Sequence, residues 1–176
     1  MILNVHGYHS AAEFDVTVAE NSAYRALRAA GFEAVSPAIN YDIEKPENII
    51  ERLETAAKES GARAIVGTSL GGFFASVLSA RTGLPVVLVN PCLLPFLHLP
   101  RLGFEGDIRP FMRLFPEIAD IPRENVSVIV GGKDEIIDSH DMTQRLFDGC
   151  VFKIVPDGKH SGSTLPLEGF FKETMK

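Results

Sequence analysis

The fold is decided by one short stretch, Ala64-Ile65-Val66-Gly67-Thr68-Ser69-Leu70-Gly71-Gly72-Phe73-Phe74. It opens with an apolar run of the kind that forms a buried strand. It closes on an apolar helical pattern that continues through Val77, Leu78 and Ala80, as expected for a helix in the middle of a molecule. The stretch therefore predicts a sharp turn from a strand into a helix, with Ser69 on the turn.

The turn matches the pattern G-x-S-x-G of a nucleophile elbow. Residues two before and two after such a serine are forced together, and glycine at Gly67 and Gly71 removes the side chains that would collide. The Ser69 hydroxyl then projects at the carboxyl edge of the sheet. The alternative is a glycine-rich turn in which the serine only caps the helix. A phosphate-binding loop is disfavoured because neither G-x-x-x-x-G-K nor G-x-G-x-x-G is present.

Outward from this turn, short Val- and Ile-rich runs alternate with amphipathic segments. The runs predict strands over residues 2–5, 33–36, 64–66, 86–90, 127–130 and 152–155. Helical patterns extend from Pro46 to Gly61, from Gly71 through Ala80, and over 143–147 and 167–175. The alternation predicts an α/β fold: a three-layer α/β/α sandwich with about six mainly parallel strands, in a single domain over 1–176.

One segment, residues 92–122, departs from this alternation. It is rich in Leu and Phe and contains Pro95, Pro100, Pro110 and Pro116, so its regular structure should be short and broken. It is either a lid over a site or a packing excursion.

Composition narrows the classes of function. The chain has 176 residues, a net charge of −6 and two cysteines. An acidic chain without a basic cluster argues against a nucleic-acid partner. The sequence shows neither a signal-peptide pattern nor a membrane-spanning run, so we expect a cytoplasmic protein without a disulfide framework and without a membrane partner. Its oligomeric state stays open.

A serine needs a neighbouring base to act as a nucleophile. His160 follows the last predicted strand, and loops at the carboxyl ends of parallel strands converge, so His160 can meet Ser69 there. Asp134 follows the strand over 127–130 and is the favoured acid, with Glu135 and Asp138 as competitors. The order Ser69, Asp134, His160 is the order that a nucleophile-elbow fold uses.

An oxyanion formed at Ser69 needs two N–H donors. We expect the backbone N–H groups of Leu70 and Tyr8, with Gly7 making room for the turn. His6 is expected to be a buried structural histidine, while His9 either lines a pocket or lies in solvent.

Three further residues receive other predictions. We expect His140 at a helix start, capping or exposed to solvent, and His98 in packing or a pocket wall. Cys92 is a weak rival nucleophile because no histidine pairs with it in the sequence.

The chain resembles the small bacterial YqiA-like esterases of the α/β-hydrolase superfamily. The resemblance covers essentially the whole chain and rests on Val5-His6-Gly7-Tyr8-His9-Ser10, Gly67–Phe73, Val87–Pro91, Asp134–Asp138 and Lys159-His160. It implies a compact hydrolase of short acyl esters or thioesters. A reaction carried by Ser69, His160 and Asp134 needs no cofactor and no metal.

The residues and the resemblance together favour a serine hydrolase whose partner is a small acyl ester. The alternatives are a catalytically silent protein of the same fold that binds a ligand or a partner, and a flavodoxin-like binding domain.

Overall fold

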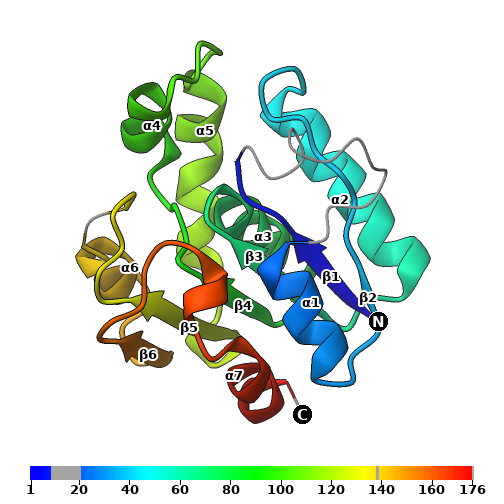
Figure 1. Cartoon of the computed structure of the whole chain (residues 1–176). Helices are drawn as coiled ribbons and strands as arrows, with labels where there is room; N and C mark the ends of the chain where they lie inside the picture. The colour runs from blue at the N-terminus through cyan, green and yellow to red at the C-terminus, as the bar shows by residue number, and fades with distance from the viewer. Residues whose placement is uncertain (9–20, 138, 176) are drawn as a thin grey trace.

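A six-stranded parallel sheet forms the centre of the protein. The computed structural model describes residues 1–8, 21–137 and 139–175. The strands lie in the order β2-β1-β3-β4-β5-β6, and each neighbouring pair is parallel (Figure 1). They are β1 (Ile2–Val5), β2 (Ala34–Val35), β3 (Ala64–Thr68), β4 (Val86–Val89), β5 (Val126–Gly131) and β6 (Val151–Val155). The predicted α/β fold is confirmed, and each strand lies within two residues of its predicted ends.

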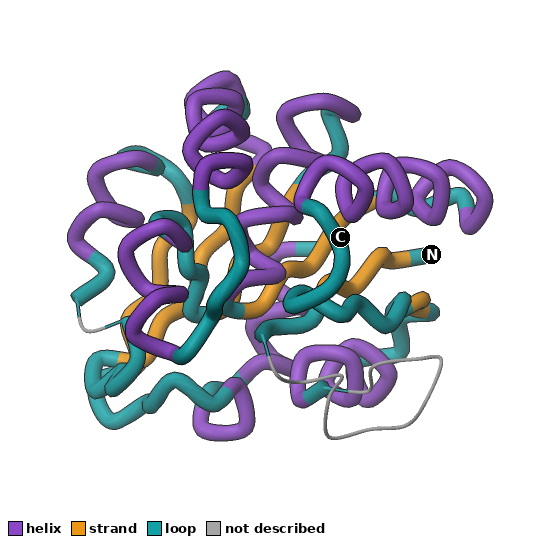
Figure 2. Tube along the Cα trace, turned by 90° about the horizontal axis from the view of Figure 1, so that it is seen from above, coloured by secondary structure: helices purple, strands orange, loops and turns teal. Residues whose placement is uncertain are grey.

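Helices cover both faces of this sheet, as the view along its layers shows (Figure 2). One face packs against α2, α3 and α5 in the larger core, and the other packs against α1 and α7 in the smaller core. The helices are α1 (Ser22–Ala29), α2 (Pro46–Ser60), α3 (Leu70–Thr82), α4 (Pro95–His98), α5 (Arg109–Leu114), α6 (Asp141–Leu146) and α7 (Leu167–Thr174).

The division into two cores follows from the alternation of side chains along each strand. Leu88 of β4 points into the larger core, whereas Val87 and Val89 point into the smaller one. In β5, Val128 and Val130 likewise face the larger core and Ile129 the smaller. Strands that are apolar on both faces are buried on both faces, which explains their continuous runs of Val and Ile.

α2 shows how the sequence sets the ends of a helix. Pro46 lies in its first turn, where the missing N–H has no helical partner to lose. Gly61 follows its last residue with φ of 61°, a conformation that glycine adopts without strain. Both predicted ends are confirmed.

α1 was not predicted from the sequence. Only Ala23 and Leu27 of its 8 residues are buried, so its apolar pattern is short. The local signal is its cap, because the Asn21 side chain accepts a hydrogen bond of 2.9 Å from the Tyr24 N–H.

Prolines divide the segment between β4 and β5 into short helices. Pro95 begins α4, and Pro110 lies in the first turn of α5. Pro100 and Pro116 lie in the first turns of the 3-10 helices Leu99–Leu102 and Phe115–Asp120. A proline fits a first turn but not a helix interior, so each one starts a new short helix.

Within the described ranges, each helix is too short or too polar to cross a bilayer.

The order of the strands reverses between β1 and β3. After β1 the chain moves outward to β2, and then returns to the other side of β1 as β3. In open parallel sheets, a crevice at the carboxyl ends of the strands where the order reverses is the usual place for a site. Ser69 follows β3 and Tyr8 follows β1, so both lie at this point.

Gly71 lies where α3 comes close to β1, and a substitution there tests this contact. A Cβ atom on Gly71 would collide with the backbone oxygens of Val5 and His6, which cannot move without shifting β1. We expect Gly71→Ala to lower the free energy of unfolding by about 3 kcal/mol or more, as measured by urea denaturation.

The matched control is Gly169→Ala in α7, where a Cβ atom meets open space. This change should raise the free energy of unfolding by about 0.5–1 kcal/mol, because alanine favours a helix. Equal effects of the two changes would contradict the packing described here.

Candidate active site

Ser69 sits in a strained backbone conformation between β3 and α3. Its φ is 52° and its ψ is −122°, in a region that residues other than glycine rarely adopt. The Ser69 N–H donates to the Val89 oxygen at 3.0 Å, and its own carbonyl accepts from Cys92 N at 2.9 Å. These bonds to the end of β4 and the loop after it hold the turn in place.

The glycines around Ser69 are required by contact. A Cβ atom on Gly67 would lie 2.5 Å from Ala75 Cβ and 2.6 Å from the Gly71 oxygen. One on Gly72 would lie 2.8 Å from Pro91 Cβ. The packing therefore leaves no room for a side chain at Gly67 or Gly71, as the sequence predicted.

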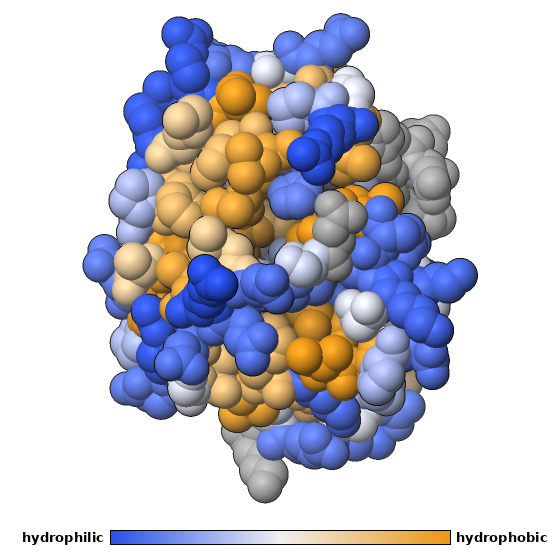
Figure 3. All heavy atoms as spheres, turned by 90° about the vertical axis from the view of Figure 1, so that its left-hand side faces the viewer, coloured by the Kyte–Doolittle hydropathy of each residue, from blue (hydrophilic) through white to orange (hydrophobic). Residues whose placement is uncertain are grey.

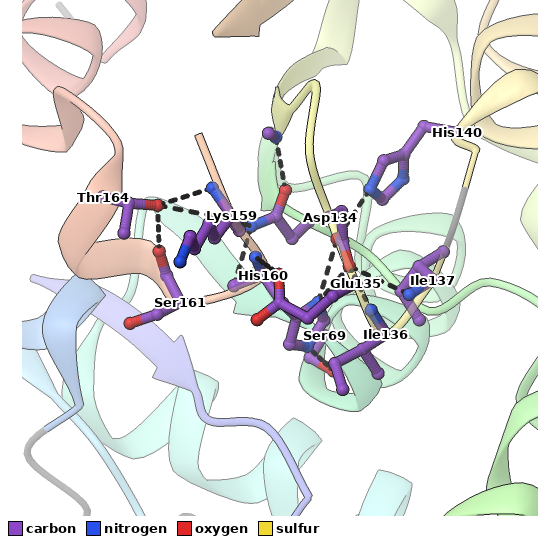
Figure 4. Close-up of polar contacts among 12 residues, drawn as sticks. Ser69, Asp134, Glu135, Ile136, Ile137, His140, Lys159, His160, Ser161 and Thr164 are labelled. Carbon is purple, nitrogen blue, oxygen red and sulfur yellow. Dashed lines mark hydrogen bonds and ion pairs between the residues drawn. The ribbon is translucent and has the colours of Figure 1, made fainter. Parts of the chain in front are cut away.

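The structure brings Ser69, His160 and Asp134 together in one hydrogen-bonded series (Figure 4). Ser69 Oγ lies 3.0 Å from His160 Nε2. His160 Nδ1 lies 3.0 Å from Asp134 Oδ1 and 2.9 Å from Asp134 Oδ2. The three residues come from the loops after β3, β6 and β5, which is the convergence that the parallel order predicts.

Asp134 is a fully buried carboxylate with four hydrogen-bond donors. Its side chain is 0% exposed. Besides His160, it accepts from the N–H groups of Ile136 and Ile137, each at 2.9 Å, and from His140 Nε2 at 2.9 Å. Burial acts to raise the pKa of Asp134, but the hydrogen bonds from His140, His160 and Ile137 outweigh it and hold that pKa well below its usual value.

The ionised acid fixes where the protons lie. A carboxylate only accepts hydrogen bonds, so Nδ1 of His160 and Nε2 of His140 must each carry a proton. In a neutral His160 ring, Nε2 is then an acceptor that faces the Ser69 hydroxyl. This is the arrangement in which an imidazole can remove a proton from a serine.

Of the two competitors of Asp134, the structure describes Glu135. Asp134 contacts the imidazole ring of His160 itself, whereas Glu135 Oε2 accepts the backbone N–H of His160 at 3.2 Å. That bond lowers the pKa of Glu135. Asp138 lies outside the described residues.

Asn90 fastens the loop that carries His160. Its Nδ2 donates to the oxygens of Lys159 and His160, at 2.9 and 2.8 Å, and its Oδ1 accepts from Gly131 N at 2.7 Å. Its φ is 43°, which asparagine tolerates better than most residues. The sequence analysis assigned no role to Asn90, although its position between a buried strand and Pro91 marks it.

The loop after β1 is held by buried polar contacts. His6 is fully buried; its Nδ1 donates to the Gly7 oxygen at 2.8 Å and its Nε2 accepts from Ile39 N at 2.8 Å. The prediction of a structural histidine is confirmed. Tyr8 follows, with its hydroxyl 2.6 Å from Asp42 Oδ1. Burial and this bond raise the pKa of Tyr8 to about 12. His9 lies outside the described residues.

Leu70 is the first residue of α3. Its N–H belongs to the first turn, where a helix offers no internal acceptor. Leu70 directly follows Ser69, and Tyr8 lies in the loop after β1, the strand that pairs with β3.

The prediction for His140 was wrong. His140 does precede α6, but its side chain makes no cap and is only 5% exposed, because its ring turns inward to Asp134. Its spacing of six residues from Asp134 gave no signal of this contact.

Cys92 and His98 lie in the segment after β4. Burial raises the pKa of the Cys92 thiol to about 12, with a further contribution from the Asp134 charge, so this sulfur stays protonated and is a poor nucleophile. His98 is half-buried at the end of α4. In the described ranges, His, Cys, Asp and Glu side chains form no group of three suited to a metal ion.

The fold defines the class of protein. Among solved structures, similar chains include Est1E from Butyrivibrio proteoclasticus (TM-score 0.69, 13% identity, 99% of this chain and 87% of that one). They also include a monoacylglycerol lipase from Paleococcus ferrophilus (TM-score 0.65, 15% identity, 99% of this chain and 91% of that one). A third is an alpha-beta serine hydrolase homologue from Coxiella burnetii (TM-score 0.61, 12% identity, 100% of this chain and 85% of that one). The protein has the α/β-hydrolase fold.

The family follows from the sequence itself. A family model described as Uncharacterised protein family (UPF0227) matches residues 1–107, which is more than half of the chain. The chain belongs to this family, which is the YqiA-like family, and the resemblance found in the sequence is confirmed.

The lowered pKa of Asp134 makes stability depend on pH. The acid is more easily ionised in the folded protein than in the unfolded chain, so its contribution is complete above pH ~4 and is lost as pH falls through the native pKa. At pH 7, we expect the free energy of unfolding of wild type to be about 2 kcal/mol or more above that of Asp134→Asn. The gap should be unchanged at pH 5 and should shrink in denaturation series at pH 4 and 3, and a gap that does not depend on pH would contradict the ionised acid.

The clamp made by Asn90 is tested by Asn90→Ala. Loss of three buried hydrogen bonds should lower the free energy of unfolding by about 2–4 kcal/mol. Hydrogen exchange at the Lys159 and His160 amides should also become faster.

Asn4→Ala is the matched control, since Asn4 is a buried asparagine of β1 whose Nδ2 bonds Ser36 and Asn21. It should destabilise the protein without selectively exposing the His160 loop to exchange. If both variants expose that loop equally, Asn90 is not its clamp.

Proposed function

We propose that the protein is a serine hydrolase that cleaves short acyl esters or thioesters of small molecules. The single observation that carries the proposal is the series Ser69 Oγ, His160 Nε2 and Nδ1, and Asp134, with each link at 2.9–3.0 Å. A buried ionised acid, an oriented imidazole and a serine on a strained turn form the arrangement that activates a hydroxyl.

The reaction follows from the positions of the protons. Ser69 Oγ forms a bond to the carbonyl carbon of the substrate while its proton passes to His160 Nε2. The tetrahedral intermediate collapses, the bond to the leaving oxygen or sulfur breaks, and His160 returns the proton to it. A water molecule then gives a proton to His160 and attacks the acyl-enzyme, which releases the carboxylic acid and restores Ser69.

The charge that develops on the carbonyl oxygen needs donors at the same edge. We assign the backbone N–H groups of Leu70 and Tyr8 to this role. Leu70 supports it by its place at the positive end of the 13-residue helix α3, and Tyr8 by its place in the loop that follows β1.

Apolar surface beside the nucleophile supports an acyl substrate. Cys92 N bonds the Ser69 oxygen, so the chain from Cys92 to α4 starts at the nucleophile turn. The residues that follow are strongly apolar, and apolar side chains gather on the face that contains α4 (Figure 3). Leu97 is 54% exposed there. We propose that residues 92–122 supply the wall that contacts the acyl chain.

Ser69→Ala tests the proposal. With purified protein and p-nitrophenyl acetate or butyrate, this change should lower kcat by about 10⁴-fold or more, because it removes the group that is acylated. Its circular dichroism and melting temperature should stay close to those of wild type, because the change to alanine removes only the hydroxyl group.

The control is Ser76→Ala, in which the removed hydroxyl is buried in α3 and bonds only the Gly72 oxygen. It should keep kcat within about threefold of wild type. Turnover of Ser69→Ala at the wild-type rate would overturn the proposal. A wild-type protein that hydrolyses no ester or thioester and does not react with a fluorophosphonate probe would indicate the catalytically silent binding protein instead.

A further inference from the structure

His140 is a buried histidine beside the triad that has no role in the proposed reaction. Its ring lies on the side of Asp134 away from Ser69 (Figure 4), and its Nε2 is 2.9 Å from Asp134 Oδ2. Its side chain is 5% exposed and its Nδ1 has no hydrogen-bond partner in the described part of the chain. A polar ring placed in the interior costs free energy, so its one strong bond is the feature to explain.

The bond completes the set of donors around the acid. Asp134 Oδ1 is held by two backbone N–H groups, those of Ile136 and Ile137. The donors to Asp134 Oδ2 among the described residues are the rings of His140 and His160 rather than backbone N–H groups. Without His140, the second oxygen would depend on His160 alone, the residue that it is meant to orient.

We propose, on the basis of the function proposed above, that His140 is a positioning residue: it anchors Asp134 Oδ2 from behind and shares the carboxylate with His160. Two donors on one oxygen compete, and each bond is weaker than it would be alone. Asp134 therefore attracts the His160 ring less strongly than it would if His140 were absent.

Other ionisable groups surround this pair and must be counted. The Cys92 thiol, from the loop after β4, feels the Asp134 charge and stays protonated. Glu135 lies beside His160 and bonds its backbone N–H, on the opposite side from His140. Both groups are the same in the variants below, so they do not alter the comparison.

The experiment compares three variants with wild type by the rate of fluorophosphonate labelling of Ser69 across pH 5–9. His140→Phe keeps a flat ring and removes the donor. His140→Gln retains an N–H near the position of Nε2. Phe147→Leu is the packing control, because Phe147 follows α6 and is 1% exposed in the larger core.

We expect the acid limb of the His140→Phe profile to move to higher pH by about half a unit, so that labelling at pH 6 falls about threefold relative to its own plateau. His140→Gln should restore the wild-type limb. Phe147→Leu should lower the melting temperature and leave the limb in place.

Each outcome decides one of the two claims. If His140→Phe keeps the wild-type limb, or if Phe147→Leu moves the limb as far, His140 is only a packing residue and the inference is overturned. Ser69→Ala run beside these variants keeps the tests separate: label found on the Ser69→Ala protein at the wild-type rate removes the proposed function itself, whatever the His140 variants do.

Discussion

The hydrogen bonds to one buried carboxylate organise this site. Removing Asp134 from water costs several kcal/mol, and the charge persists only because four donors surround it. Charge-assisted bonds of about 1.5–3 kcal/mol each are of the size needed to offset that cost. Two donors come from the backbone next to Asp134, and two come from histidines before α6 and after β6. The acid thus fixes the loop after β5 and the orientation of the imidazole at once.

The sheet makes this contact possible. Ser69 and His160 are 91 residues apart, yet each follows a parallel strand, so each emerges at the same edge. Asn90 ties the end of β4 to the last residue of β5 and to the loop of His160, which follows β6. The strain at Ser69 persists because its backbone bonds, and the close packing of Gly67 and Gly72, leave the turn no other path.

The sequence predicted those parts whose signal is local. Val-rich runs gave the strands, Pro46 and Gly61 gave the ends of α2, and the glycines around Ser69 gave the turn. Contacts that depend on side-chain direction were harder to predict. His140 was expected at the surface because a position before a helix is usually exposed, and only the fold of the loop after β5 turns it inward. α1 was missed because two buried residues make too weak a pattern. Asn90 bonds the end of β5 and the loop of His160, two segments that are distant from it in sequence, which a single sequence does not reveal.

The central claim is that Ser69 becomes acylated when His160 accepts its proton. The most direct measurement is rapid acid quenching of the protein during its reaction with p-nitrophenyl butyrate, followed by mass spectrometry of the intact chain and its peptides. The account predicts a transient mass increase of one butyryl group on the peptide that contains Ser69, which disappears when the ester is consumed. An adduct on Cys92 or elsewhere, or ester hydrolysis by wild type with no acylated Ser69 at any quench time, would contradict it.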